Sequence, residues 1–305
     1  MATRFRFFCW LSLFGLVAIQ SAVAESDVTA TNETPAVLLS VKRSGDWVLV
    51  ESPNFRCWSQ LPESDARLLA ESCETWRGRL RTTWISEPSP AAWIPKCEVY
   101  IHPHRAAYNQ ALSRPGDVSV GSTIMNFDQG RTVQRRIDVR ADASDWSNAA
   151  LPHELTHVVL GERFGGHALP RWADEGIAML SESAEKSRER LENLRTILSQ
   201  GPTLSMIDLI RMNRMPQPQL RDAFYGQSIA LTSLLVRKST PARFADFVAD
   251  SVAGGMNQAL QRHYSLENVS TLQQEWNEWI KRPEAMTFVS LPIQTGKAAA
   301  VAVAP

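Results

Sequence analysis

Apolar residues in the first half of the chain recur with a helical period in one segment and alternate as in strands in several others. From Glu63 to Trp84 they occupy positions 66, 69, 73, 76, 80 and 84, the spacing of an amphipathic helix. Short alternating or β-branched runs predict strands on both sides of this helix. These runs are 47–50, 54–59, 97–102, 117–128 and 133–140. The first half therefore predicts one helix packed on a sheet of about four or five strands.

The second half of the chain has helical patterns only. A helix from about Ser144 to Arg163 contains Pro152, so it either kinks at the proline or begins later. A stripe of leucines at positions 191, 194 and 198 predicts a helix over 183–199. Other expected helices cover 221–238, follow the Thr240-Pro241 cap as far as Gly254-Gly255, and follow a capping box of Ser270 and Gln273.

The amino terminus has the pattern of a signal peptide. Arg4 and Arg6 precede an apolar run over 7–19, and Ala22-Val23-Ala24 is a small-residue cleavage site. The run is too short, and too close to that site, for a stable membrane anchor. We expect residues 1–24 to be removed and the protein to be periplasmic or extracellular.

Outside the signal peptide, two further segments differ in composition from the middle of the chain. Residues 25–45 are polar and are predicted to be flexible. Residues 283–305 become rich in Ala, Val and Pro and are predicted to be a disordered tail. Removing residues 1–24 takes away two arginines, so 32 − 2 = 30 basic residues face 32 acidic ones, a net charge of −2. No basic cluster suggests a nucleic-acid partner.

Three cysteines remain after residue 24: Cys57, Cys73 and Cys97. Strand alternation places Cys57 and Cys97 on the apolar faces of two strands, and Cys73 lies on the apolar stripe of the helix between them. All three are expected to meet in one small core. The odd number allows at most one intramolecular disulfide, and the pattern leaves open which two pair or whether any do. Without CxxC spacing, packing is favoured over a metal site.

The run His153-Glu154-Leu155-Thr156-His157 carries the chemistry of this chain. On a helix its two histidines stand on one face and can bind one Zn²⁺, while Glu154 projects about 100° away and can act as general base. Catalytic zinc needs a third protein ligand and an open position, and Glu175 follows His157 by 18 residues. A structural zinc site would use a fourth ligand and would not need Glu154. A chance match on a solvated helix face is the alternative.

The segments HELTHVVL and LPRWADEGIAML, within Leu151 to Leu180, resemble the gluzincin metallopeptidases. They are most similar to the poorly characterised bacterial peptidase MA-like domains, which have HExxH, a short loop and W-x-x-E-G. The resemblance is looser over 55–280. It implies one Zn²⁺ per chain, held by His153, His157 and Glu175, with Glu154 as base and proton shuttle. Asp174 stands where such motifs usually have Asn.

The resemblance also implies a fold. It is an α+β, thermolysin-like zincin: a small mixed sheet with a packed helix, then the active-site helix, then a helical carboxy-terminal lobe. The peptidase domain is expected over 46–282, with its α+β part at 46–163 and its helical part at 164–282. Substrate would lie in the cleft between these parts.

Further candidate residues surround this motif. Similar domains often carry a tyrosine in the carboxy-terminal lobe, which makes Tyr225 the candidate donor to the oxyanion, with packing on a helix as the alternative. Asp174 either orients an imidazole or caps its helix. The strand Val133 to Arg140 is a candidate edge for an extended peptide, although most such strands pair within the sheet. Histidines outside the motif are expected to be structural or solvated: His102, His104, His167 and His263.

The leading hypothesis is an exported zinc metallopeptidase that acts on a peptide or protein substrate. The absence of a separate motif for gripping a free amino terminus tilts this towards an endopeptidase. The alternatives are a zinc amidase acting on cell-wall peptides, a binding module on a retired peptidase fold, and a structural envelope protein. Intact His153, Glu154, His157 and Glu175 argue against the binding module, because a retired site has no reason to keep all four, and a structural protein with an incidental motif is the least favoured. The oligomeric state stays open, as does removal of a propeptide over 25–50.

Overall fold

The computed structural model describes residues 39–86, 92–167 and 169–287. The predicted signal peptide lies outside these residues, as do positions 25–38 of the predicted flexible segment and 288–305 of the predicted tail. Within the described part, none of the helices has the length and apolar character needed to cross a membrane.

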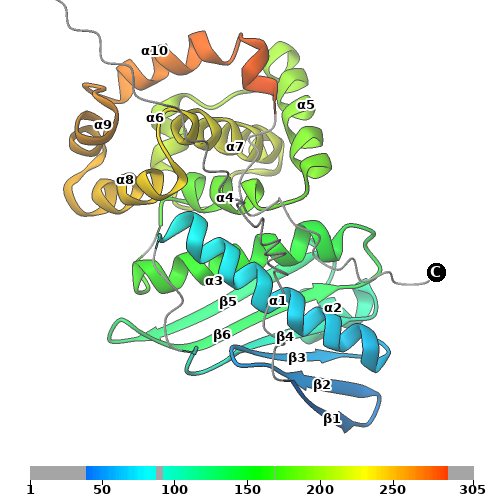
Figure 1. The fold of residues 1–305 in the computed structure, drawn as a ribbon. Coiled ribbons are helices and arrows are strands. Elements are labelled where there is room, and N and C mark those ends of the chain that lie inside the picture. The colour runs from blue at the N-terminus through cyan, green and yellow to red at the C-terminus, as the bar shows by residue number, and fades with distance from the viewer. Residues whose placement is uncertain (1–38, 87–91, 168, 288–305) are drawn as a thin grey trace, which may run out of the picture. The chain divides into compact units, whose positions relative to one another are not determined.

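The described residues form a mixed sheet of six strands in the order β1-β2-β3-β4-β6-β5 (Figure 1). The strands are β1 Ser40–Ser44, β2 Trp47–Glu51, β3 Phe55–Ser59, β4 Cys97–His102, β5 Gly121–Asp128 and β6 Arg131–Arg140. The central strands β3, β4 and β6 are parallel, and the other pairs are antiparallel. The α+β class is therefore confirmed.

Strand β1 corrects the prediction that all of residues 25–45 are flexible. Ser40–Ser44 pairs along its length with β2 as the edge of the sheet, and its side chains are mostly exposed. Backbone hydrogen bonds hold such a strand whatever its side chains, and charged residues suit an edge strand because they discourage pairing with other chains. Polar composition therefore could not reveal it.

Helix α1, Glu63–Trp84, has the predicted bounds and packs on β2 and β3 (Figure 1). The three cysteines lie fully buried in the core between this helix and the sheet, and all three are free thiols. A hydrogen bond with Cys57 and burial raise the pKa of Cys73, and burial raises that of Cys97. The predicted common core is confirmed, and no disulfide joins these three residues.

The segment before the active-site helix resolves the ambiguity that Pro152 left. A π-helical turn spans Trp146–Ala150, and α3 follows directly as Leu151–Phe164. Pro152 is therefore the second residue of α3, directly after a π-helical turn in which the Leu151 N–H donates to the Trp146 oxygen. Helix α3 packs on α1, β5 and β6.

The remaining chain is helical, as predicted. Its helices are α4 Arg171–Leu180, α5 Ala184–Gln200, α6 Met206–Arg211, α7 Arg221–Arg237, α8 Pro241–Gly254, α9 Met256–Tyr264 and α10 Val269–Trp279. Short helices α2, Arg105–Ala111, and η2, Pro218–Leu220, complete the connections. Helix α7 is buried on nearly all sides and packs against α4, α5 and α8 (Figure 1).

Of three predictions about the starts of α8, α10 and the tail, the structure bears out the first and contradicts the other two. Thr240 caps α8 by accepting a hydrogen bond from the Arg243 N–H, as predicted. The Ser270 and Gln273 capping box is wrong, because Asn268 caps α10 instead and Gln273 accepts from the Met206 N–H. The predicted tail is also wrong at its start: residues 283–286 form the 3₁₀ helix η3, in which Ala285 is buried and anchors the turn.

Gly176 permits the close approach of α4 and α7. A Cβ atom there would lie 2.1 Å from Thr232 Oγ1 and 2.8 Å from the backbone oxygen of Ser228. We expect Gly176→Ala to lower the free energy of unfolding by about 1–3 kcal/mol, because two buried helices must separate. Gly78→Ala on α1, whose Cβ would meet nothing within 4 Å, should leave stability equal or slightly higher. Urea unfolding of both variants checks this, and equal midpoints would contradict it.

Candidate metal centre and active site

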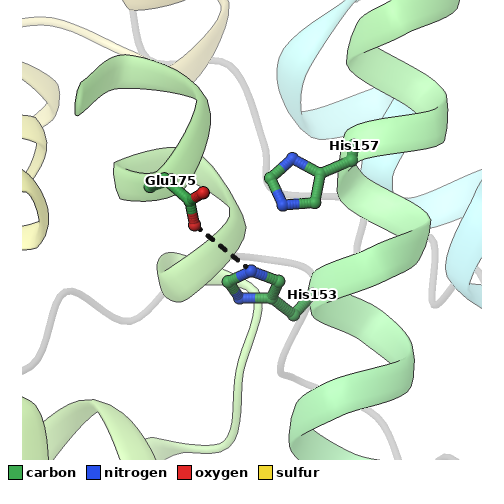
Figure 2. Close-up of side chains that lie close together, drawn as sticks. All are labelled: His153, His157 and Glu175. Carbon is green, nitrogen blue, oxygen red and sulfur yellow. Dashed lines mark ion pairs between the residues drawn. The ribbon is translucent and has the colours of Figure 1, made fainter. Parts of the chain in front are cut away.

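Three side chains from two helices converge beside the sheet. His153 and His157 lie four residues apart on one face of α3, and Glu175 of α4 points towards them (Figure 2). One ligand atom from each residue lies within 4.8 Å of the others, and His153 Nε2 is 3.6 Å from Glu175 Oε2. In the described part of the chain, these residues form the one group of His, Cys, Asp and Glu side chains suited to a metal ion.

The chain between the two helices turns sharply enough to bring Glu175 back to the histidines. Helix α3 ends at Phe164, and Gly165 follows with a φ of 57°, a left-handed conformation that glycine adopts without a Cβ penalty. Pro170 then precedes α4, which begins at Arg171. Because this loop is short, Glu175 returns to the histidines only 18 residues after His157.

Each imidazole is held by a carboxylate on its other nitrogen. His153 Nδ1 lies 2.8 Å from Glu182 Oε1, and His157 Nδ1 lies 2.8 Å from Asp174 Oδ1. Both rings therefore keep Nε2 for a ligand. Of the two roles predicted for Asp174, the structure selects the orientation of an imidazole. This arrangement fixes the ring and increases the basicity of the nitrogen that faces the site.

The electrostatics of the cluster suit a cation. Burial lowers the pKa of His153, but hydrogen bonds with Glu175 and Glu182 outweigh it and raise the pKa to about 10. Burial likewise lowers the pKa of His157, and Asp174 raises it to about 9. Burial raises the pKa of Glu175, but the two histidines outweigh this and lower it to about 2.

The donor set fits zinc. Two imidazole nitrogens and one carboxylate oxygen are the ligands of catalytic zinc sites, and the surrounding carboxylates already balance positive charge on the rings. A divalent ion would take the place of the imidazole protons, so metal uptake would release protons.

Glu154 lies in the same site and is held by strand β5. Thr123 Oγ1 donates to Glu154 Oε2 at 2.6 Å, and Glu154 is buried. A Cβ atom at Gly121 would lie 2.7 Å from Glu154 Cγ, so glycine allows the strand to pass this close. The sequence motif identified Glu154 but gave no sign of its partner.

Strand β5, and not β6, is the edge beside the site. The strand proposed for peptide binding, Val133 to Arg140, lies in β6 and pairs with β4 on one side and β5 on the other. That proposal is therefore wrong. Strand β5 ends the sheet and lines a cleft of about 1020 Å³ that also contains the three candidate ligands and Glu154. Sequence order could not reveal this because the hairpin places the later strand inside.

Tyr225 of α7, the candidate oxyanion donor, lines the same cleft. Its hydroxyl contacts Met215 Sδ at 3.9 Å, and burial raises its pKa to about 12. The phenol therefore stays protonated at neutral pH, and its O–H is directed at the Met215 sulfur in this structure.

The four histidines outside the motif do not join the three ligands. His102 is buried against Asp138, and His263 pairs with Asp250. His104 accepts from the Ala107 N–H and caps α2. His167 is exposed at the rim of the cleft.

The model of the peptidase MA superfamily matches residues 92–282, which is more than half of the chain. The chain belongs to the peptidase MA superfamily. The match to this metallopeptidase superfamily runs from just before β4 to the end of α10 and includes all residues of the site. No curated protein shows significant similarity to the chain.

Sequence reasoning missed four residues of this peptidase MA site, one of them Arg171, whose Nη2 donates to Glu175 Oε1 at 3.0 Å. Thr123 holds Glu154, Glu182 holds His153, and Arg190 holds Glu182 through bonds of 2.6 and 2.7 Å. Glu182 lies in the turn just after α4 ends at Leu180, so no helical spacing linked it to Glu175 and the sequence carried no signal for it. Thr123 and Arg190 carried none, because they come from a distant strand and the next helix.

Proposed function

We propose that this protein is an exported zinc-dependent metallopeptidase that hydrolyses peptide bonds, with one zinc ion bound by His153, His157 and Glu175. The observation that carries the proposal is the convergence of these three donors in one cleft with Glu154. Carboxylates on both outer imidazole nitrogens support it further. Export rests on the predicted signal peptide, which places the protein in the periplasm or outside the cell.

The residues of the site take distinct roles. Bound zinc would make water acidic and polarise the substrate carbonyl. Glu154 takes the proton of the attacking water on its carboxylate and delivers it to the leaving amine nitrogen. Tyr225 donates a hydrogen bond to the carbonyl oxygen as negative charge develops there. Its raised pKa keeps the hydroxyl protonated throughout the neutral range.

The position of β5 supports an endopeptidase. Its unpaired edge can add an extended peptide through backbone hydrogen bonds. Residues before Gly121 line the cleft on one side of Glu154, and Met125 and Phe127 line it on the other. A peptide bound along this edge would therefore extend past the site in both directions.

Digestion of a diverse peptide mixture tests this proposal. The protein beginning at Glu25 is purified with zinc, incubated with the mixture, and its products are read by mass spectrometry. We expect internal cuts that disappear after treatment with a zinc chelator and return when zinc is restored. A fully zinc-loaded protein that leaves every peptide intact would overturn general peptidase activity.

Thr123 provides a separate prediction about the base. Thr123→Val removes the hydroxyl that donates to Glu154 but keeps the branched shape. A hydrogen bond to a charged group contributes about 1.5–3 kcal/mol, so kcat is expected to fall on the order of tenfold. Thr123→Ser should recover most of the loss because it restores the donor. Steady-state kinetics of both variants check this, and equal losses in both would contradict the role of the hydroxyl.

A further inference from the structure

Arg190 of α5 contacts the carboxylate that holds the metal-ligand candidate His153. Its Nε and Nη2 atoms donate to Glu182 Oε2 and Oε1 at 2.7 and 2.6 Å. The same Glu182 Oε1 lies 2.8 Å from His153 Nδ1. The Glu182 side chain is 3% exposed, so the carboxylate at the centre of these contacts is largely removed from water, which strengthens its ion pairs.

The same guanidinium also contacts Tyr225. Arg190 Cζ lies 5.7 Å from the centroid of the Tyr225 ring, within the range of a cation–π interaction. The two bonds to Glu182 fix the orientation of the guanidinium, and with it the position of the cation beside the aromatic ring. Arg190 is thus in contact with a carboxylate that orients His153 and with the aromatic ring whose hydroxyl reaches the cleft.

We propose that Arg190 is a positioning residue that links the His153 metal ligand to Tyr225. This inference rests on the proposed function for its catalytic meaning, but the linkage itself is a property of the three side chains. A bound metal would fix the ring of His153. Through Glu182 and Arg190, that fixed position would restrict the position of the Tyr225 ring. Lysine cannot replace arginine here, because a single ammonium group lacks the planar fork that serves Glu182 while facing the ring.

Zinc affinity and the geometry of the metal site test the first half of the linkage. We expect Arg190→Lys to weaken zinc binding in chelator competition by about tenfold, the lower end of the effect of losing a direct partner of a metal ligand, because Arg190 acts on His153 through Glu182. The visible spectrum of the cobalt-substituted protein should change with it. Arg188→Gln is the matched control, because Arg188 is an exposed arginine on the same helix. Wild-type affinity and spectrum in Arg190→Lys would overturn this half.

The response of Tyr225 tests the second half. With 3-fluorotyrosine placed at position 225, zinc is expected to shift the ¹⁹F resonance in the wild-type background and in Arg188→Gln. In Arg190→Lys, saturated with zinc, this shift should fall by more than half. A zinc-induced shift equal to that of the wild type would overturn the linkage. These readouts need no turnover, so they separate a failure of this inference from a failure of the proposed peptidase activity.

Kinetics show whether the linkage serves catalysis. If the protein is a peptidase, Arg190→Lys should lower kcat at saturating zinc and leave KM within about twofold, because ground-state binding is not its role. In the Tyr225→Phe background the same substitution should have little further effect on kcat. Losses that simply multiply would show that Arg190 does not act through Tyr225.

Discussion

Glu154→Gln is expected to retain one zinc ion per chain and to lose peptide cleavage almost completely. The amide has nearly the shape of the carboxylate and is not among the three ligand candidates, so the metal site should stay intact. It cannot accept the proton of the attacking water, and losing a general base lowers kcat by about 10²–10⁴-fold. Single-turnover kinetics on a peptide cleaved by the wild type, together with zinc content, measure both effects.

The position of Glu154 makes this result diagnostic. Its carboxylate is tied to Thr123 on β5 and does not share the hydrogen bonds that orient His153 and His157. Gln can still accept from the Thr123 hydroxyl, so its side chain should keep the same position. Activity within about threefold of the wild type at full zinc occupancy would exclude Glu154 as the base.

Glu175→Gln is expected to remove zinc binding, the second large effect. Glu175 is the charged donor among the three ligands and lies close to His153 Nε2. Losing one partner of such a buried charged contact costs about 3–5 kcal/mol, which corresponds to roughly 10²–10³-fold in zinc affinity or more. Cleavage should fall with the metal. Zinc content after gel filtration and chelator competition measure the loss.

Thermal unfolding gives the same prediction without an activity assay. Zinc at about 1,000 times its Kd should stabilise the wild type by about 4 kcal/mol, because the folded state binds the ion. Glu175→Gln should gain little from zinc. Glu267→Gln, the same substitution at an exposed site on a distant loop, should respond as the wild type does. An equal zinc response in Glu175→Gln would remove Glu175 from the ligand set.

Local periodicity was enough to predict much of the fold. Helix α1 has the predicted bounds, because a single stripe of buried residues runs along its whole length. Strand β4 was also predicted at its observed bounds. The polar edge strand β1 was missed. Its side chains look like those of a flexible segment, and the strand is held by backbone hydrogen bonds to β2, which composition does not show. Helix α10 begins earlier than its supposed capping box, since Gln273 is used in a contact with α6 that no local pattern contains.

The sequence by itself identified the three candidate metal ligands and brought them within reach of one another. The spacing of His153 and His157 puts both on one face of any helix, and the following Glu175 supplies the third donor after a short turn. Only the tertiary structure decided what supports these residues. Sheet order made β5 the edge that holds Glu154, and the packing of α5 against α7 brought Arg190 between Glu182 and Tyr225. Helical spacing is a local property of the chain, whereas contacts between distant elements arise only when the core is packed.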